Sequence, residues 1–171
     1  TATGRFEFYR ENPLPRAATT KVPTAEEIEI NRMAHWFPPL EAWPENELYK
    51  KYPLVLMSER PRYRVHSQWF STPLLRELDP EPSAKLHPDT AEAHGIAEGD
   101  YMRIYNDRGE VVVKAHLSDG VRPGILLCSR GWEDADFVKG HLQDVLSDEV
   151  SNLCVTQAFF DTTAAIEKAE V

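Results

Sequence analysis

Residues 86–109, LHPDTAEAHGIAEGDYMRIYNDRG, limit the possible folds of this chain more than any other stretch. Pro88 suits the first turn of a helix, because its ring fixes φ and that turn leaves its backbone nitrogen unpaired in any case. Gly95 stands where a left-handed residue would end this helix. Apolar and polar residues then alternate over 101–105, and an Asn-Asp-Arg-Gly turn leads into 110–117. The stretch predicts a short helix followed by two strands joined by a tight turn.

Short apolar runs, separated by glycine, proline and aspartate, occupy most of the remaining chain. We expect further strands over residues 4–10, 53–58, 84–86, 124–129, 152–158 and 163–168. We expect helices from Thr24 to the prolines at 38–39, and over 45–52, 68–78 and 134–147. In the helix over 68–78, a buried stripe is expected from Trp69, Leu74, Leu75 and Leu78. This order predicts a mainly β (α+β) fold, a compact barrel with helical insertions.

Length and charge exclude several classes of protein. The chain has 171 residues, which suits one domain with a real core. Its 28 acidic and 19 basic residues give a net charge of −9, which argues against nucleic acid as a partner. No apolar run is long enough to span a bilayer, and the first residues are not a signal peptide. The chain begins without methionine, so we expect a piece of a longer polypeptide or a processed subunit.

The two cysteines, Cys128 and Cys154, are far apart in apolar runs and are predicted to be buried free thiols. The chain has no C-x-x-C motif, so neither a zinc ribbon nor an iron–sulfur cluster is supported. The six histidines form no H-x-x-x-H pair. We therefore expect no metal held by side chains of this chain.

Polar residues after the apolar run 53–58 are candidates for binding an anion. Three arginines, at positions 60, 62 and 64, could hold phosphates, because a guanidinium binds two oxygens at once; they could equally form a solvated strand edge. Ser67 is expected to cap the following helix, whose N-terminus would favour an anion. Asn152 lies between apolar residues, where its amide needs a partner, either a ligand or a backbone turn.

Several motifs, in this order and spacing, resemble the C-terminal domain of the dimethyl sulfoxide reductase family. They are H-P-x-x-A-x-x-x-G-I-x-x-G-D with N-D-R-G, PLVLMSERPRYRVHSQ at 53–68, P-G-I at 123–125, G-W at 131–132 and TGRFEFY at 3–9. Members of this family carry molybdenum or tungsten on two pyranopterin guanine dinucleotides. The resemblance implies a six-stranded double-psi β-barrel over residues 53–171. Residues 1–52 would be a lead-in strand, a proline-rich extended arm and a helix.

The resemblance also implies a cofactor-binding site. Its residues are Ser58, Glu59 and Arg60 in the [ST]-x-R position, Arg64, His66, Ser67 and Gln68 in the H-S-x position, Asn152 in the N-x-L-T position, and Asp161. Two departures stand out: the threonine after Asn152 is displaced to Thr156, and the D-P-x-[ST]-G segment before Asp161 is missing. The family's metal ligand and iron–sulfur motif lie upstream, so no catalytic residue is assigned here. We expect the isolated chain to lack the cofactor and to be inactive.

The implied function is to hold this cofactor in the catalytic subunit of a molybdopterin oxidoreductase during two-electron and oxygen-atom transfer. Expected partners are the upstream domains of the same polypeptide, with iron–sulfur and membrane-anchor subunits of the parent enzyme, in the periplasm or cytoplasm of a prokaryote. Two alternatives stay open. One is a standalone double-psi subunit like that of tungsten formylmethanofuran dehydrogenase. The other is a protein-interaction barrel without cofactor, which would not use Arg60, His66 or Asn152.

Overall fold

The computed structural model describes residues 3–11, 24–30, 32–33, 36, 38–149, 157–158 and 160–171. They fall into two units, one formed from 1–38 and 148–158 and the other from 39–147 and 159–171. Residues 39–52, which the sequence assigns to the lead-in, thus pack with the barrel. Asn152 and Cys154 lie outside the described residues, as does most of the strand expected over 152–158.

In the first unit, helix α1 (Ala25–Ile30) follows Thr24 as predicted, and the backbone nitrogen of Ile28 donates to the Thr24 carbonyl at 3.0 Å. The helix ends earlier than expected. The strand predicted over 4–10 is not formed, since the only pairing among residues 3–11 is an isolated bridge between Tyr9 and Met33. An alternation of apolar and polar residues needs a partner strand to become a strand.

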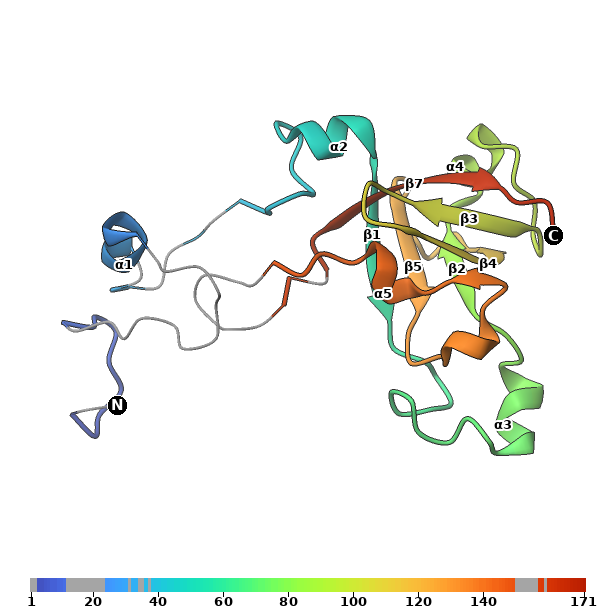
Figure 1. Cartoon of the computed structure of the whole chain (residues 1–171), viewed down its shortest axis with the longest axis horizontal. Helices are drawn as coiled ribbons and strands as arrows, with labels where there is room; N and C mark the ends of the chain where they lie inside the picture. The colour runs from blue at the N-terminus through green and yellow to red at the C-terminus, as the bar shows by residue number, and fades with distance from the viewer. Residues whose placement is uncertain are drawn as a thin grey trace. The chain divides into compact units, whose positions relative to one another are not determined.

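The second unit is a closed barrel (Figure 1). Its strands are β1 (Leu54–Glu59), β2 (Ser83–Leu86), β3 (Tyr101–Tyr105), β4 (Glu110–Leu117), β5 (Ile125–Ser129) and β7 (Thr162–Lys168). They pair in the order β2-β5-β1-β7-β3-β4, and β4 returns to β2 and closes the ring. Two pairings, β1 with β5 and β2 with β4, are parallel, and the others in the ring are antiparallel. The predicted six-stranded double-psi barrel is confirmed.

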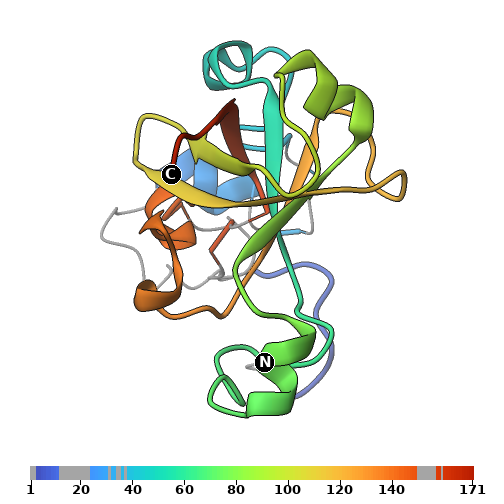
Figure 2. The same ribbon diagram turned by 90° about the vertical axis from the view of Figure 1, so that its right-hand side faces the viewer.

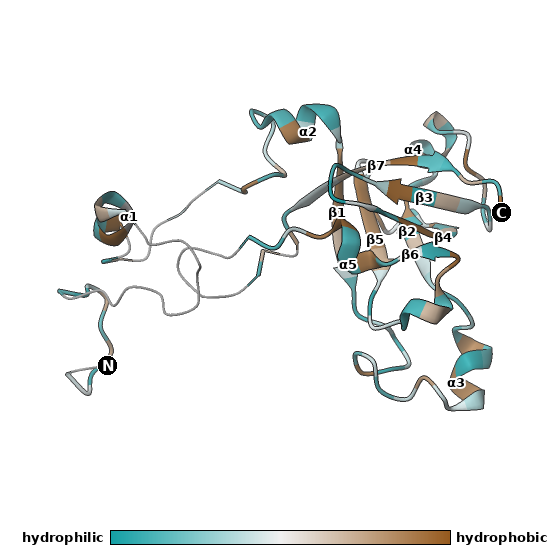
Figure 3. Ribbon diagram, viewed as in Figure 1, coloured by the Kyte–Doolittle hydropathy of each residue, from teal (hydrophilic) through white to brown (hydrophobic). Residues whose placement is uncertain are grey.

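The barrel interior is filled by apolar residues at alternate positions of the six strands of the ring. Apolar residues are the brown segments of the strands in Figure 3. Examples are Leu54 and Leu56 on β1, and Leu126 and Cys128 on β5, all of them buried. This period of two matches the pleat of a strand. Cys128 is confirmed as a buried free thiol, and this burial raises the pKa of the thiol to about 12.

Two predicted helices around the barrel are confirmed. Helix α2 (Glu47–Lys51) begins after Asn46, whose side-chain oxygen accepts from the backbone nitrogen of Leu48 at 2.8 Å. Helix α4 (Pro88–Ala93) is capped by His87, and Gly95 follows it with φ at +65°. None of the helices in the described ranges is long and apolar enough to cross a membrane.

Two other helices are shorter than predicted. Helix α3 (Pro73–Leu78) lies in the excursion between β1 and β2, which extends from one end of the barrel (Figure 2). The expected buried stripe is wrong, because Trp69, Leu74 and Leu78 are 61%, 64% and 52% exposed. Residues 134–147 form three short elements instead of one helix. These are η1 (Asp134–Asp136), β6 (Lys139–Gly140), which pairs with β4, and α5 (Leu142–Val145).

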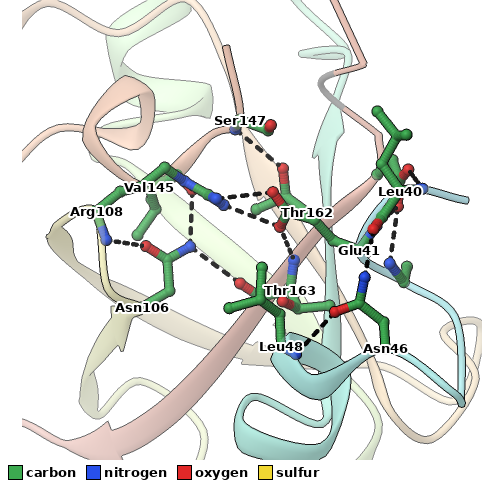
Figure 4. A network of polar contacts seen from close by, with 12 residues as sticks. Leu40, Glu41, Asn46, Leu48, Asn106, Arg108, Val145, Ser147, Thr162 and Thr163 are labelled. Carbon is green, nitrogen blue, oxygen red and sulfur yellow. Dashed lines mark hydrogen bonds and ion pairs between the residues drawn. The ribbon is translucent and has the colours of Figure 1, made fainter. Parts of the chain in front are cut away.

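A network of polar contacts joins residues 39–46 to the barrel (Figure 4). The buried carboxylate of Glu41 accepts from the Arg108 guanidinium at 2.7 and 3.0 Å and from the Thr163 backbone nitrogen at 3.2 Å. The Asn106 amide donates to the carbonyl oxygens of Val145 at 2.8 Å and Thr163 at 3.0 Å. The predicted turn over 106–109 is therefore also a clamp between distant segments.

Truncating a core leucine should distinguish the barrel interior from its surface. Leu56→Ala removes a fully buried side chain and should lower the free energy of unfolding by about 2–5 kcal/mol, because it leaves a cavity. Leu74→Ala, the same change at an exposed position, should alter it by less than about 0.5 kcal/mol. Urea denaturation of both variants measures the difference, and equal losses would contradict this assignment of the core.

Candidate functional site

The candidate site lies where β1 and β5 end side by side. The two strands are parallel, with Ser58 opposite Cys128 and Glu59 opposite Ser129, so both chains leave the barrel at the same end. Just beyond, the Arg130 backbone nitrogen donates to the Glu59 carbonyl at 3.2 Å. The loops that follow two parallel strands are a common place for ligand-binding residues.

A glycine lets the two loops come into backbone contact. Gly131 has φ at +90°, and a Cβ atom there would lie 2.3 Å from the His66 carbonyl oxygen. Only a residue without a side chain fits this approach. The loop after β5 therefore packs directly against the peptide between His66 and Ser67, two of the predicted site residues.

Two buried polar atoms near the ends of β1 and β5 lack a hydrogen-bond partner among the described residues, as do Nε and Nη1 of Arg64 and Nη1 of Arg76. Ser58 continues the inward-facing row of Leu54 and Leu56 on β1, and Arg130 directly follows β5, two residues after the buried Cys128. The Ser58 hydroxyl oxygen and the Arg130 Nε are buried, and neither has a partner within the described part of the chain. Buried polar atoms are nearly always paired in folded proteins. These two atoms are therefore available to a bound molecule.

Glu59 and Arg60 directly follow Ser58 but differ in their surroundings. The Glu59 carboxylate accepts from the Lys85 ammonium on β2 at 2.6 Å. Arg60 is exposed, and no carboxylate in the described ranges pairs with it. Of the two, Arg60 has the free side chain.

His66, Ser67 and Gln68 form a tight turn and not the start of a helix. The Gln68 backbone nitrogen donates to the Val65 carbonyl at 2.9 Å, and His66 has φ at +52°. The predicted helix start at Gln68 is wrong, since α3 begins at Pro73 after Thr72. Ser67 is therefore no helix cap, and no helix of the described residues begins at this position. All three side chains are exposed, and their role in binding stays a prediction.

Arg64 is enclosed by the protein itself. Its side chain is fully buried and forms an ion pair with Asp79. The guanidinium carbon lies 4.0 Å from the ring centre of Phe70 and 3.8 Å from that of Trp132. Phe70 belongs to the loop after β1 and Trp132 to the loop after β5, where its indole nitrogen donates to the Ser129 hydroxyl at 2.9 Å. In this arrangement, Arg64 joins the two loops.

Asp161 is also occupied by the chain. Its carboxylate accepts from three consecutive backbone nitrogens, those of Leu40, of Glu41 at 3.1 Å and of Ala42 at 2.8 Å. These bonds hold the segment before α2 against the start of β7. Three of the roughly four acceptor positions of the Asp161 carboxylate are thus used within the chain, and its role in cofactor binding stays a prediction. Asn152 is outside the described residues.

Unpaired cations gather at this end of an acidic chain. Among the described residues of the barrel unit, every lysine forms an ion pair with a carboxylate. The arginines there without such a pair are Arg60, Arg62, Arg122 and Arg130. Three of these four follow β1 or β5. The local excess of positive charge favours an anionic ligand.

The described residues contain no group of three or more histidine, cysteine, aspartate or glutamate side chains placed to hold a metal ion. Hydroxyl, amide and guanidinium groups predominate at the site. This donor set suits a large organic anion better than a bare cation.

Comparison with known proteins agrees with the geometry. Residues 54–167, from β1 to β7, match the profile of a protein family. The family is described as "Molydopterin dinucleotide binding domain", a spelling of molybdopterin. The chain belongs to this family. Its members bind molybdopterin guanine dinucleotide with molybdenum, and the chain's likeness to the dimethyl sulfoxide reductase family is confirmed.

Two relatives illustrate the match. The chain is 44% identical over 119 residues to a putative catalytic chain of dimethyl sulfoxide reductase from Halobacterium salinarum, covering 70% of this chain and 14% of that protein. It is 33% identical over 148 residues to the dimethyl sulfoxide/trimethylamine N-oxide reductase of Rhodobacter capsulatus, covering 78% of this chain and 18% of the relative. The chain thus spans less than a fifth of the length of these relatives.

A solved structure shares the fold. Acetylene hydratase from Pelobacter acetylenicus superimposes with a TM-score of 0.70 at 21% identity, covering 81% of this chain and 21% of that one.

Ser58 and the unpaired arginines fit the family's dinucleotide, because a hydroxyl suits the edge of a pterin or guanine and guanidinium groups suit a pyrophosphate.

Arg130 and Gly131 are the residues whose roles sequence reasoning missed. Arg130 follows a predicted strand in inward register with Leu126 and Cys128, and this period of two was the available signal. The close approach of Gly131 to His66 depends on two segments that are distant in sequence. No local pattern reveals such a contact.

Substituting two glycines with alanine should measure the contact between the loops. Gly124→Ala introduces only the strain of a positive φ, about 1–2 kcal/mol, because nothing lies within 4 Å of the new Cβ. Gly131→Ala adds a collision with backbone and should cost about 1–3 kcal/mol more. Urea denaturation gives both values. Equal destabilisation would contradict the packing of Gly131 on His66.

The structural role of Arg64 can be tested in the same way. Arg64→Lys keeps the charge but loses the flat group that contacts Phe70 and Trp132, so it should lower the free energy of unfolding by about 1–3 kcal/mol. Arg62→Lys, at an exposed position of the same loop, is the matched control and should change it by less than about 0.5 kcal/mol. If both variants unfold like the parent chain, Arg64 does not hold the loops together.

Proposed function

We propose that this chain is the cofactor-binding C-terminal domain of the catalytic subunit of a molybdopterin oxidoreductase similar to dimethyl sulfoxide reductase. The chain would hold the bis-pyranopterin guanine dinucleotide during two-electron and oxygen-atom transfer. The main support is that the family profile spans β1 to β7 and so includes the ends of β1 and β5, where Ser58 and Arg130 have unpaired buried polar atoms. The relatives' names support a reductase of sulfoxides or amine N-oxides.

The work of this chain is to bind and orient the cofactor. When bound, the metal and its dithiolenes supply the redox chemistry. The buried Ser58 hydroxyl at the end of β1 would bind a ring edge, and the exposed Arg60 in the following loop would bind phosphate. His66 and Gln68 would add contacts from the turn that packs on Gly131, with Asn152 as a further predicted contact. The pair of Glu59 with Lys85 and the contacts of Arg64 hold these segments in place.

The remaining parts of the proposal concern the whole protein. The relatives are several times longer than this chain, which supports upstream domains of the same polypeptide as its first partners. Iron–sulfur and membrane-anchor subunits would join the assembled enzyme, in the periplasm or cytoplasm of a prokaryote. The Halobacterium relative is named as a catalytic subunit, which agrees with an enzyme of several subunits.

Cofactor analysis of the full-length parent protein tests this function. Purified anaerobically, it should contain about one molybdenum or tungsten and about two releasable GMP per polypeptide, measured by metal mass spectrometry and nucleotide chromatography. Ser58→Ala should lower the GMP content because the buried hydroxyl contact is lost, whereas Ser71→Ala, an exposed serine of the loop before α3, should not. A folded, matured protein with neither metal nor GMP would favour the interaction-barrel alternative.

A further inference from the structure

Arg130 carries a charge that the described chain does not neutralise. Its Nε is buried without a hydrogen-bond partner, and no carboxylate in the described ranges lies within ion-pairing distance of its guanidinium. Arg64 and Arg76 also have buried nitrogens without a hydrogen-bond partner in the described part of the chain, but their charges pair with Asp79 and Asp136. Sequence reasoning had no role for Arg130.

The carboxylates of Glu59 and Asp136, close to this end of the barrel, are already paired. Glu59, whose carbonyl accepts from the Arg130 backbone nitrogen, directs its own carboxylate to Lys85 at 2.6 Å. The Asp136 carboxylate forms an ion pair with Arg76, whose Nη2 lies 2.8 Å from Oδ1. Neither Glu59 nor Asp136 can neutralise Arg130 without breaking its present pair.

The backbone of Arg130 is held firmly. Its nitrogen is fixed on Glu59, the preceding Ser129 is bound by Trp132, and the following Gly131 lies against His66. Arg130 lies two residues after the inward-facing Cys128 of β5, as Ser58 lies two residues after the inward-facing Leu56 of β1. A backbone that is already fixed before the ligand arrives lowers the conformational entropy that is lost on binding.

An unpaired, partly buried guanidinium costs free energy in the empty protein, because it loses water without gaining an anion. The cost is recovered if an anionic oxygen binds, since charge-assisted hydrogen bonds are among the strongest in proteins. Arginine is the side chain best suited to phosphate, through its planar set of donors.

We propose that Arg130 is a further cofactor-binding residue, whose guanidinium binds a phosphate oxygen of the dinucleotide's pyrophosphate. The proposal rests on the proposed function and adds to it a residue on β5's side of the site. Ser58 and Arg130 then approach the cofactor from two neighbouring parallel strands.

The test uses the full-length catalytic subunit in its cofactor-loaded form. Arg130→Met keeps much of the side-chain length but removes the charge and the donors. The dinucleotide should dissociate roughly 10- to 100-fold faster, measured as GMP that remains with the protein after timed gel filtration. Arg122→Met is the matched control, because Arg122 is exposed, also lacks an ion pair among the described residues and lies before β5 instead of after it. Arg130→Lys keeps the charge without the planar group and should fall between the two.

A second readout separates binding from structure. In the cofactor-free subunit, from cells that cannot make the pterin, Arg130→Met should leave the thermal unfolding temperature unchanged or raise it, because an unpaired charge is removed. A merely structural arginine would lower it. The proposal therefore expects weaker cofactor retention without loss of stability in the empty protein.

The outcomes are distinct. If wild-type protein holds metal and GMP and Arg130→Met retains GMP as well as Arg122→Met does, the role of Arg130 is refuted and the proposed function stands. If Arg130→Met lowers the stability of the empty subunit, the residue is structural and the inference is again wrong. If the wild-type protein holds no GMP, the proposed function itself fails.

Discussion

Parallel pairing of β1 with β5 is the constraint on which the candidate site depends. Because the two strands run in the same direction, Glu59 and Ser129 are register partners and the loops that follow leave the barrel together. An antiparallel pair would send these loops to opposite ends. The site therefore arises from the topology of the barrel, and the loops need only supply the chemistry.

The arginines of this chain serve two different purposes, and ion pairing distinguishes them. Arg64, Arg76 and Arg108 pair with carboxylates and join segments that are far apart in sequence. Arg60 and Arg130 have no such carboxylate among the described residues, and they follow the two parallel strands. The chain has a net negative charge, but it can attract an anionic cofactor to one place because most of the other cations of its barrel already pair with carboxylates.

Local patterns were enough to predict much of the barrel. The helix at 88–93, the glycine that follows it and the strands on either side of the turn at 106–109 each depend on neighbouring residues, so sequence reasoning found them. The helix expected over 68–78 failed because positive φ values at His66 and Trp69 have no sequence signal. Arg130 was missed for another reason. Arg130 stands out because Glu59 and Asp136 pair with other cations, and these pairs are visible only in the three-dimensional structure.

The ion pair and hydrogen bonds of Glu41 extend the folding unit beyond the segment that the family profile matches. The profile begins at residue 54, yet the Arg108 guanidinium and the Thr163 backbone nitrogen both bind a carboxylate thirteen residues earlier. A chimera that exchanged only the profile-matched segment between relatives would have to keep this carboxylate from one parent and its cation from the other. The natural unit of exchange in this chain is therefore the barrel together with residues 39–53. A crossover between Glu41 and Arg108 would leave the buried carboxylate without its cation wherever the other parent lacks that cation.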